Sequence, residues 1–188
     1  IVEKQIRTQA LGVLWKLAHE PDVRLTLSSK KTELLDLLVD LFQDSEDQGR
    51  AFTLLLFEQL AKHQANKLLF VSPSFELLFN LLSVIRENYD LRPIALRVIW
   101  NLVDIKENQI YLADPRLGFV SLIVGILNND STPTNIVSLS LSILKHLVLP
   151  GRNKLVLCSF NGLLKGLKLI IETMEEIDHE CVDNAVEI

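Results

Sequence analysis

The stretch ALRVIWNLVDIKENQIYL (residues 95–112) decides the fold, because the chain contains it four times in varied form. It opens as an amphipathic helix, breaks at the segment DIKE (residues 104–107) and continues as a shorter helix. Its tetrapeptide WNLV has counterparts in WKLA, EQLA and KHLV. The leucines of these tetrapeptides, called anchors below, are spaced 43, 42 and 45 residues apart: Leu17, Leu60, Leu102 and Leu147. Spacings of about 40–47 residues are typical of helical repeat proteins.

The similarity extends over several positions before each anchor. Every copy has a leucine six residues before the anchor and a large apolar residue three before it. These positions, the anchor and the residue after it share one stripe of an α-helix, so we expect the stripe to be buried. Seven residues before the anchor the side chain is always small, which predicts that another helix approaches closely there. The small residues are Ala10, Thr53, Ala95 and Ser140.

Two further segments follow each anchor. After a polar break comes a short apolar segment, and after a second break a longer apolar one, at residues 33–42, 75–82, 118–127 and 162–171. The eighth position past the anchor is apolar in all four short segments: Leu25, Leu68, Ile110 and Leu155. The sequence therefore predicts an all-α protein whose units each contain a long, a short and a long helix.

This unit resembles the armadillo repeat, over about residues 5–172 of the chain. ALRVIWNLV matches the family's last helix, ENQIYL its short first helix, and ADPRLGFVSLIVGIL its middle helix, with Gly118 at the family's glycine and Gly162 in that place in the last copy. HEAT repeats, with two helices per unit, are the near alternative, and the short helix favours armadillo. The resemblance implies a right-handed α-solenoid of about three and two-thirds units, which begins inside a third helix and ends after a middle one.

The domain expectation follows from the same repeat. We expect residues 1–188 to form a single armadillo-like domain that is a fragment of a longer chain. The acidic segment after residue 173 is expected to cap the array or to begin another unit.

Composition excludes several classes of protein. The chain is 48% hydrophobic and 23% charged, which is enough apolar material for a core. A formal net charge of −5 argues against a general nucleic-acid binder, which needs a basic face. Two cysteines give no disulfide framework, so we expect an intracellular protein, cytoplasmic or nuclear, with Cys158 buried as a small apolar residue. No apolar run reaches the roughly 18–20 residues of a membrane span.

The armadillo resemblance also implies a binding site, because third helices in that family line a concave groove that holds extended peptides or helices. The family's asparagine, one before the anchor, can donate to and accept from a peptide backbone, and only Asn101 keeps it here. Arg97 and Trp100 beside it have the composition of an interaction hot spot, although an arginine lying over the core and a packing tryptophan explain them equally well. The expected groove residues are Lys16, Gln59, Arg97, Trp100, Asn101, Ser142 and His146.

A second candidate surface lies on the short helices. The seventh position past the anchor is Arg24, Lys67, Gln109 or Lys154, which could form a basic stripe for an acidic partner. A solvated face explains these residues more simply.

The sequence contains no phosphate-binding, nucleophile-elbow or zinc-protease motif, so we expect no enzyme, cofactor or metal site. The first hypothesis is a scaffold that binds a peptide or helix of another protein. The alternatives are a regulator of a GTPase or ATPase, such as an exchange factor or chaperone cofactor, and a structural array that assembles through its open ends. Nuclear-import receptors of this superfamily carry tryptophans five residues before the anchor, and their absence here argues against a receptor for nuclear-localisation signals.

Overall fold

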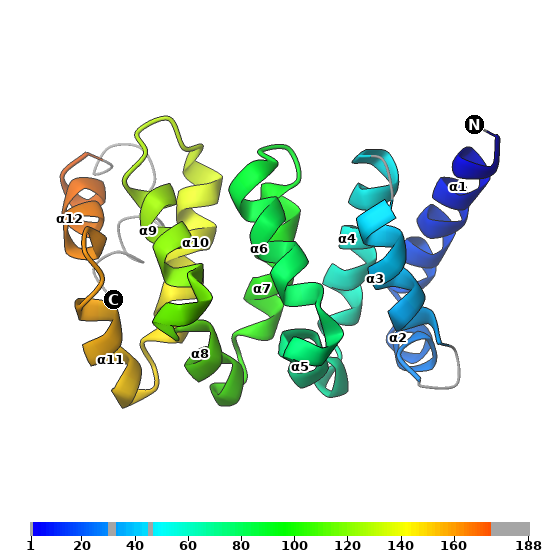
Figure 1. Ribbon diagram of the computed structural model, residues 1–188, viewed down its shortest axis with the longest axis horizontal. Coiled ribbons are helices and arrows are strands. Elements are labelled where there is room, and N and C mark those ends of the chain that lie inside the picture. The colour runs from blue at the N-terminus through cyan, green and yellow to red at the C-terminus, as the bar shows by residue number, and fades with distance from the viewer. Residues whose placement is uncertain (1, 30–32, 45–46, 174–188) are drawn as a thin grey trace. The chain divides into compact units, whose positions relative to one another are not determined.

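The computed structural model describes residues 2–29, 33–44 and 47–173 (Figure 1). Within these ranges it contains twelve α-helices, two 3-10 turns and no strand, which confirms the all-α prediction. None of the described helices is long and apolar enough to cross a membrane. The expectation for the segment after residue 173 falls outside the described residues.

The predicted order of long, short and long helices is confirmed. Each third helix ends at an anchor leucine: α1 (Val2–Leu17), α4 (Asp47–Leu60), α7 (Arg92–Leu102) and α10 (Thr134–Leu147). The short first helices are α2 (Pro21–Leu27), α5 (Gln64–Val71), α8 (Lys106–Leu112) and α11 (Gly151–Cys158). The middle helices are α3 (Leu34–Asp44), α6 (Leu77–Glu87), α9 (Phe119–Leu127) and α12 (Leu163–Thr173). The 3-10 turns η2 (Pro73–Phe75) and η3 (Pro115–Leu117) precede α6 and α9.

The helices form two compact units, residues 1–102 and residues 103–188. In the first, which we call unit 1, α4 packs against α1 on one side and α7 on the other, so the three third helices lie side by side. The middle helices α3 and α6 pack on α4 and α7. In the second, unit 2, α9 packs between α10 and α12.

The stripe around each anchor forms the core, as predicted, except in α1. In α4 the residues Thr53, Leu54, Phe57 and Leu60 are all fully buried. In α1, Leu11 and Ala18 are buried, but Ala10 is exposed and Leu17 is 48% exposed, so the prediction is wrong for these two. The difference arises because α3 covers that side of α4, whereas no described helix covers that side of α1.

Buried asparagines on the short helices hold the ends of the third helices. The last carbonyls of an α-helix have no partner within it. Asn66 Nδ2 donates to the anchor carbonyl of Leu60 at 2.8 Å, and Asn153 Nδ2 donates to that of Leu147 at 2.8 Å. Asn153 Nδ2 also donates to Gln109 O at 3.0 Å, which links α11 to α8. Asn66 and Asn153, each six residues past an anchor, thus hold the end of the preceding third helix, and Asn153 also links two successive repeats of unit 2.

This asparagine row explains why the apolar row two residues later is mostly exposed. Leu25, Leu68 and Leu155 are exposed and Ile110 is half-buried. Two residues correspond to about 200° around a helix, so a side chain two positions past a buried asparagine points away from the core. The apolar character of this row therefore does not place its three leucines in the core.

The family's glycine marks a left-handed backbone position before each middle helix. Gly118 has φ 76° and Gly162 has φ 90°, as expected from the resemblance. The equivalent residues of the first two units, Glu33 and Glu76, also have positive φ, at 47° and 59°. A side chain disfavours this conformation. Glycine therefore makes the turn in two repeats, and a glutamate makes the same turn under backbone strain in the other two.

The expectation for Cys158 is wrong, because this cysteine is exposed at the end of α11. Its neighbour Leu157 is buried and occupies the core-facing position.

Replacing Gly118 and Gly125 by alanine should have opposite effects on stability. A Cβ on either residue would meet no atom within 4 Å, so only the backbone conformation differs. We expect Gly118→Ala to lower the free energy of unfolding by about 1–2 kcal/mol, because φ is positive there. Gly125→Ala, inside α9, should raise it by about 0.5–1 kcal/mol. Urea unfolding monitored by circular dichroism measures both, and equal effects of the same sign would contradict the assignment.

Replacing Asn153 by alanine should destabilise the protein by about 2–3 kcal/mol, because two buried carbonyls lose their donor. The matched control is Asn135→Ala, on an exposed side chain of α10, with an expected change within about 0.5 kcal/mol. Urea unfolding compares the two variants. A similar small decrease in the free energy of unfolding for both variants would show that Asn153 does not hold successive repeats together.

Candidate functional site

The candidate site is the side of the third helices that is turned away from the buried stripe. It consists of the residues one, two and five positions before each anchor. In unit 1 these nine residues, called the third-helix face below, lie on three neighbouring helices: Gly12, Trp15, Lys16, Leu55, Glu58, Gln59, Arg97, Trp100 and Asn101.

A hollow of about 500 Å³ opens at this face where α1 meets α4. Gly12 lies at its wall beside Phe52, where a Cβ would be in ordinary van der Waals contact with the Phe52 ring at 3.4 Å. The Phe52 and Trp15 rings lie with centroids 6.0 Å apart. Lys16, predicted as a groove residue, is exposed at its border. The full lining is Gln5, Thr8, Gln9, Gly12, Val13, Trp15, Lys16, Gln48 and Phe52.

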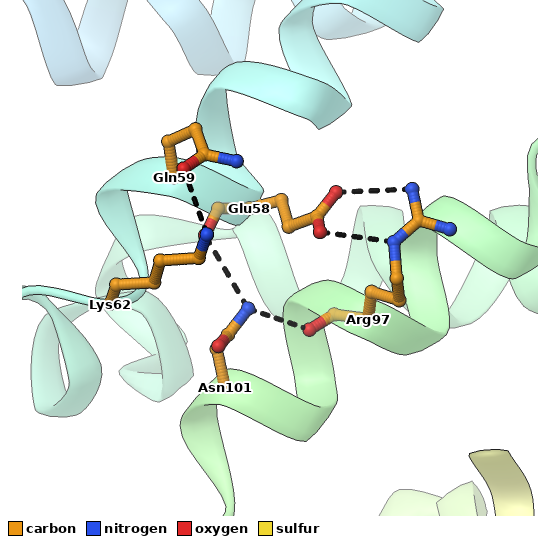
Figure 2. A network of polar contacts seen from close by, with 5 residues as sticks. All are labelled: Glu58, Gln59, Lys62, Arg97 and Asn101. Carbon is orange, nitrogen blue, oxygen red and sulfur yellow. Dashed lines mark hydrogen bonds and ion pairs between the residues drawn. The ribbon is translucent and has the colours of Figure 1, made fainter. Parts of the chain in front are cut away.

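The junction between α4 and α7 is closed by an ion pair (Figure 2). Arg97 Nε donates to Glu58 Oε1 at 3.0 Å, and Arg97 Nη2 donates to Glu58 Oε2 at 3.1 Å. The Arg97 side chain is 40% exposed and that of Glu58 only 14%, so solvent screens the pair incompletely. Such a two-point contact fixes the orientation of both side chains. Arg97 therefore connects two successive repeats of unit 1, and its guanidinium already has a partner.

Asn101 reinforces the same junction. Its Nδ2 donates to Arg97 O at 3.0 Å and to Glu58 O at 3.4 Å (Figure 2). Gln59 is only 7% exposed, and its Oε1 accepts from Lys62 Nζ at 2.9 Å. Among the described residues, no donor bonds to the Asn101 amide oxygen. That oxygen is the part of the predicted asparagine that remains for a partner.

Trp100 is the most exposed large apolar residue of the third-helix face. Its side chain is 44% exposed, one residue from Asn101, whereas Trp15 is half-buried. The structure thus distinguishes the two tryptophans, which the sequence treats alike.

Two predicted groove residues belong to unit 2. Ser142 and His146 are half-buried on α10. His146 borders a hollow of about 580 Å³ between α10, α11 and α12, together with Lys145 and several leucines. The structure therefore brings Gln59, Arg97 and Asn101 into one network, and places Lys16 at the hollow of unit 1 and His146 at that of unit 2.

The basic stripe on the short helices does not form. Lys67 and Gln109 are buried, which interrupts any exposed row of positive charge. The described residues also contain no group of three side chains that could hold a metal ion.

Comparison with solved structures identifies the fold. A designed armadillo repeat protein in complex with the peptide (KR)4 superposes with a TM-score of 0.80 at 15% identity, over 97% of this chain and 74% of that one. Computationally designed armadillo repeat proteins for modular peptide recognition give 0.78 at 16% identity, over 95% and 72%. The chain has the armadillo repeat fold. No protein-family model and no curated protein matches the sequence.

The armadillo fold places one charged residue at the site that sequence reasoning did not select. Glu58 is the partner of both Arg97 and Asn101. A signal for it exists: opposite charges stand two and five residues before the anchor in successive armadillo units. Gln48 and Phe52, in contrast, lie outside the repeated rows, and only the packing of α4 on α1 brings them to the hollow.

The ion pair should contribute about 1 kcal/mol of coupling to the stability of the α4–α7 junction. A double-mutant cycle with Glu58→Gln, Arg97→Met and the combined variant isolates this energy in urea unfolding. The expected value is at the upper end for partly exposed pairs because the contact is two-pointed. A coupling energy near zero would mean that the junction is held by apolar packing alone.

Proposed function

We propose that this protein is a non-catalytic binding module that holds a peptide or helix of another protein on the third-helix face of unit 1. The exposed Trp100 carries the proposal. A tryptophan that remains 44% exposed beside a fixed ion pair exposes apolar surface which a partner can cover. Tryptophan is also among the residues most enriched at the energetic centre of interfaces.

The surroundings of Trp100 support binding because they are fixed before a partner arrives. The bonds to Glu58 come from Arg97, three residues before Trp100, and from Asn101, the residue after it. Groups that are already ordered lose little conformational entropy on binding. The free amide oxygen of Asn101 is then available to accept an N–H group from a peptide backbone.

The comparisons support the same proposal by analogy. A designed protein with this fold was solved with the peptide (KR)4, and others were designed for modular peptide recognition. Those identities are 15% and 16%, so the fold is shared and the binding surface of the present chain is argued from its own residues.

Truncating Trp100 should weaken peptide binding at least tenfold. Peptides are selected from a displayed random library on the wild-type protein, and their dissociation constants are compared for Trp100→Ala and Phe79→Ala. Phe79 is the matched control, because it is 52% exposed but lies on the middle helix α6. We expect a loss only with Trp100→Ala. Equal affinity of both variants, or no selectable peptide, would contradict the proposed function.

A further inference from the structure

The third-helix face of unit 1 has almost no negative charge to offer a partner. Among its nine residues Glu58 is the only carboxylate, and both of its oxygens accept from Arg97. A basic side chain would have to displace Arg97 to reach it. The remaining charge on this face is that of Lys16, so the nine residues have a net positive charge. The whole chain, in contrast, has a formal net charge of −5.

The hollow between α1 and α4 has the same polarity. Of the residues that line it, only Lys16 is charged, and no carboxylate is among them. Its polar lining consists of three glutamine side chains and a threonine hydroxyl, from Gln5, Gln9, Gln48 and Thr8. The three glutamine amides can donate hydrogen bonds to an anion, whereas the Thr8 hydroxyl already donates to Lys4 O at 3.0 Å.

An acceptor is missing beside this hollow. Trp15 borders it, and the indole Nε1 of Trp15 is buried without a hydrogen-bond acceptor in the described part of the chain. An indole N–H is a donor only, and a buried donor without a partner costs about 1–3 kcal/mol. A group that brings acceptor oxygens to this position, after a small side-chain movement, would remove that cost. No ion pair among the described residues engages Lys16.

We propose that the segment bound by unit 1 is acidic, and that one of its Asp or Glu side chains enters the hollow beside Lys16. This inference rests on the proposed function and names the chemistry of the partner. The proposed segment is opposite in charge to the peptide (KR)4 that is bound in the designed armadillo repeat protein. Charge complementarity favours it locally, since repulsion from carboxylates more than about 8 Å away is screened at physiological salt.

Three octapeptides that differ only in charge test the inference. The acidic peptide is Glu-Ala-Glu-Leu-Glu-Ala-Glu-Leu, and the other two have Lys or Gln in place of each Glu. Their binding to the full chain is measured by fluorescence anisotropy of a terminal dye. We expect the acidic peptide to bind at least tenfold more tightly than the basic one, with the neutral peptide between them.

The variant Lys16→Glu should weaken the acidic peptide at least tenfold and strengthen the basic one. Lys165→Glu is the matched control, because the same charge change falls on an exposed residue of the middle helix α12, and it should leave both affinities within twofold. Circular dichroism checks that both variants keep the helical content of the wild type.

The other outcomes separate the inference from the proposed function. Equal binding of the three peptides, lost with Trp100→Ala, would retain the binding face and overturn the acidic preference. Tighter binding of the basic peptide, or an acidic affinity insensitive to Lys16→Glu, would also overturn it. If none of the three peptides binds, the inference of an acidic partner is wrong. The library selection with the Trp100→Ala variant then decides the proposed function independently.

Discussion

The stacking of each third helix on the next is the constraint on which the rest of unit 1 depends. A third helix can bury its stripe only if a middle helix covers it and neighbouring third helices flank it, as α4 shows between α1, α3 and α7. Those contacts use most of the surface of the helix. The remaining side has no helix of unit 1 to pack against. Which residue types occur there therefore depends on solvent, on contacts between neighbouring third helices and on a binding partner.

The contacts along that face determine its chemistry. Between α4 and α7 two successive repeats of unit 1 are joined by Glu58 and Arg97, which neutralise each other, and Asn101 adds a bond to the backbone. Between α1 and α4 the equivalent positions are Trp15 and Leu55, which cannot form an ion pair, and a hollow remains at this junction. One repeated architecture thus produces a closed polar junction and an open one side by side, and the open junction is the one with unbonded donors.

The sequence predicted the fold well because every unit repeats the same burial pattern. The anchor leucines end all four third helices, and Gly118 and Gly162 occupy the left-handed turns. The errors arise where a residue has different neighbours from its counterparts. Leu17 is exposed because α1 lacks a covering helix among the described residues, and Cys158 is exposed because its neighbour Leu157 occupies the core-facing position of α11.

The site was harder to predict for the same reason. A row of positions identifies which side of a helix faces outward, but not which side chains bond to each other across a junction. Arg97 and Asn101 were selected as contact residues, and the structure shows both engaged with Glu58. Trp100 is 44% exposed and Trp15 is half-buried, a difference that the repeated pattern of a single helix cannot reveal.

The most direct test of the binding face uses the two tryptophans as internal probes. Trp15 and Trp100 are the only tryptophans of the chain and both belong to the third-helix face, so the two indole N–H signals in a ¹⁵N-correlated NMR spectrum report on its two junctions separately. On titration with a peptide selected from the displayed library, both signals should shift and saturate with one dissociation constant. If the peptide binds and neither indole signal moves, binding occurs elsewhere and the third-helix face of unit 1 is not the binding site.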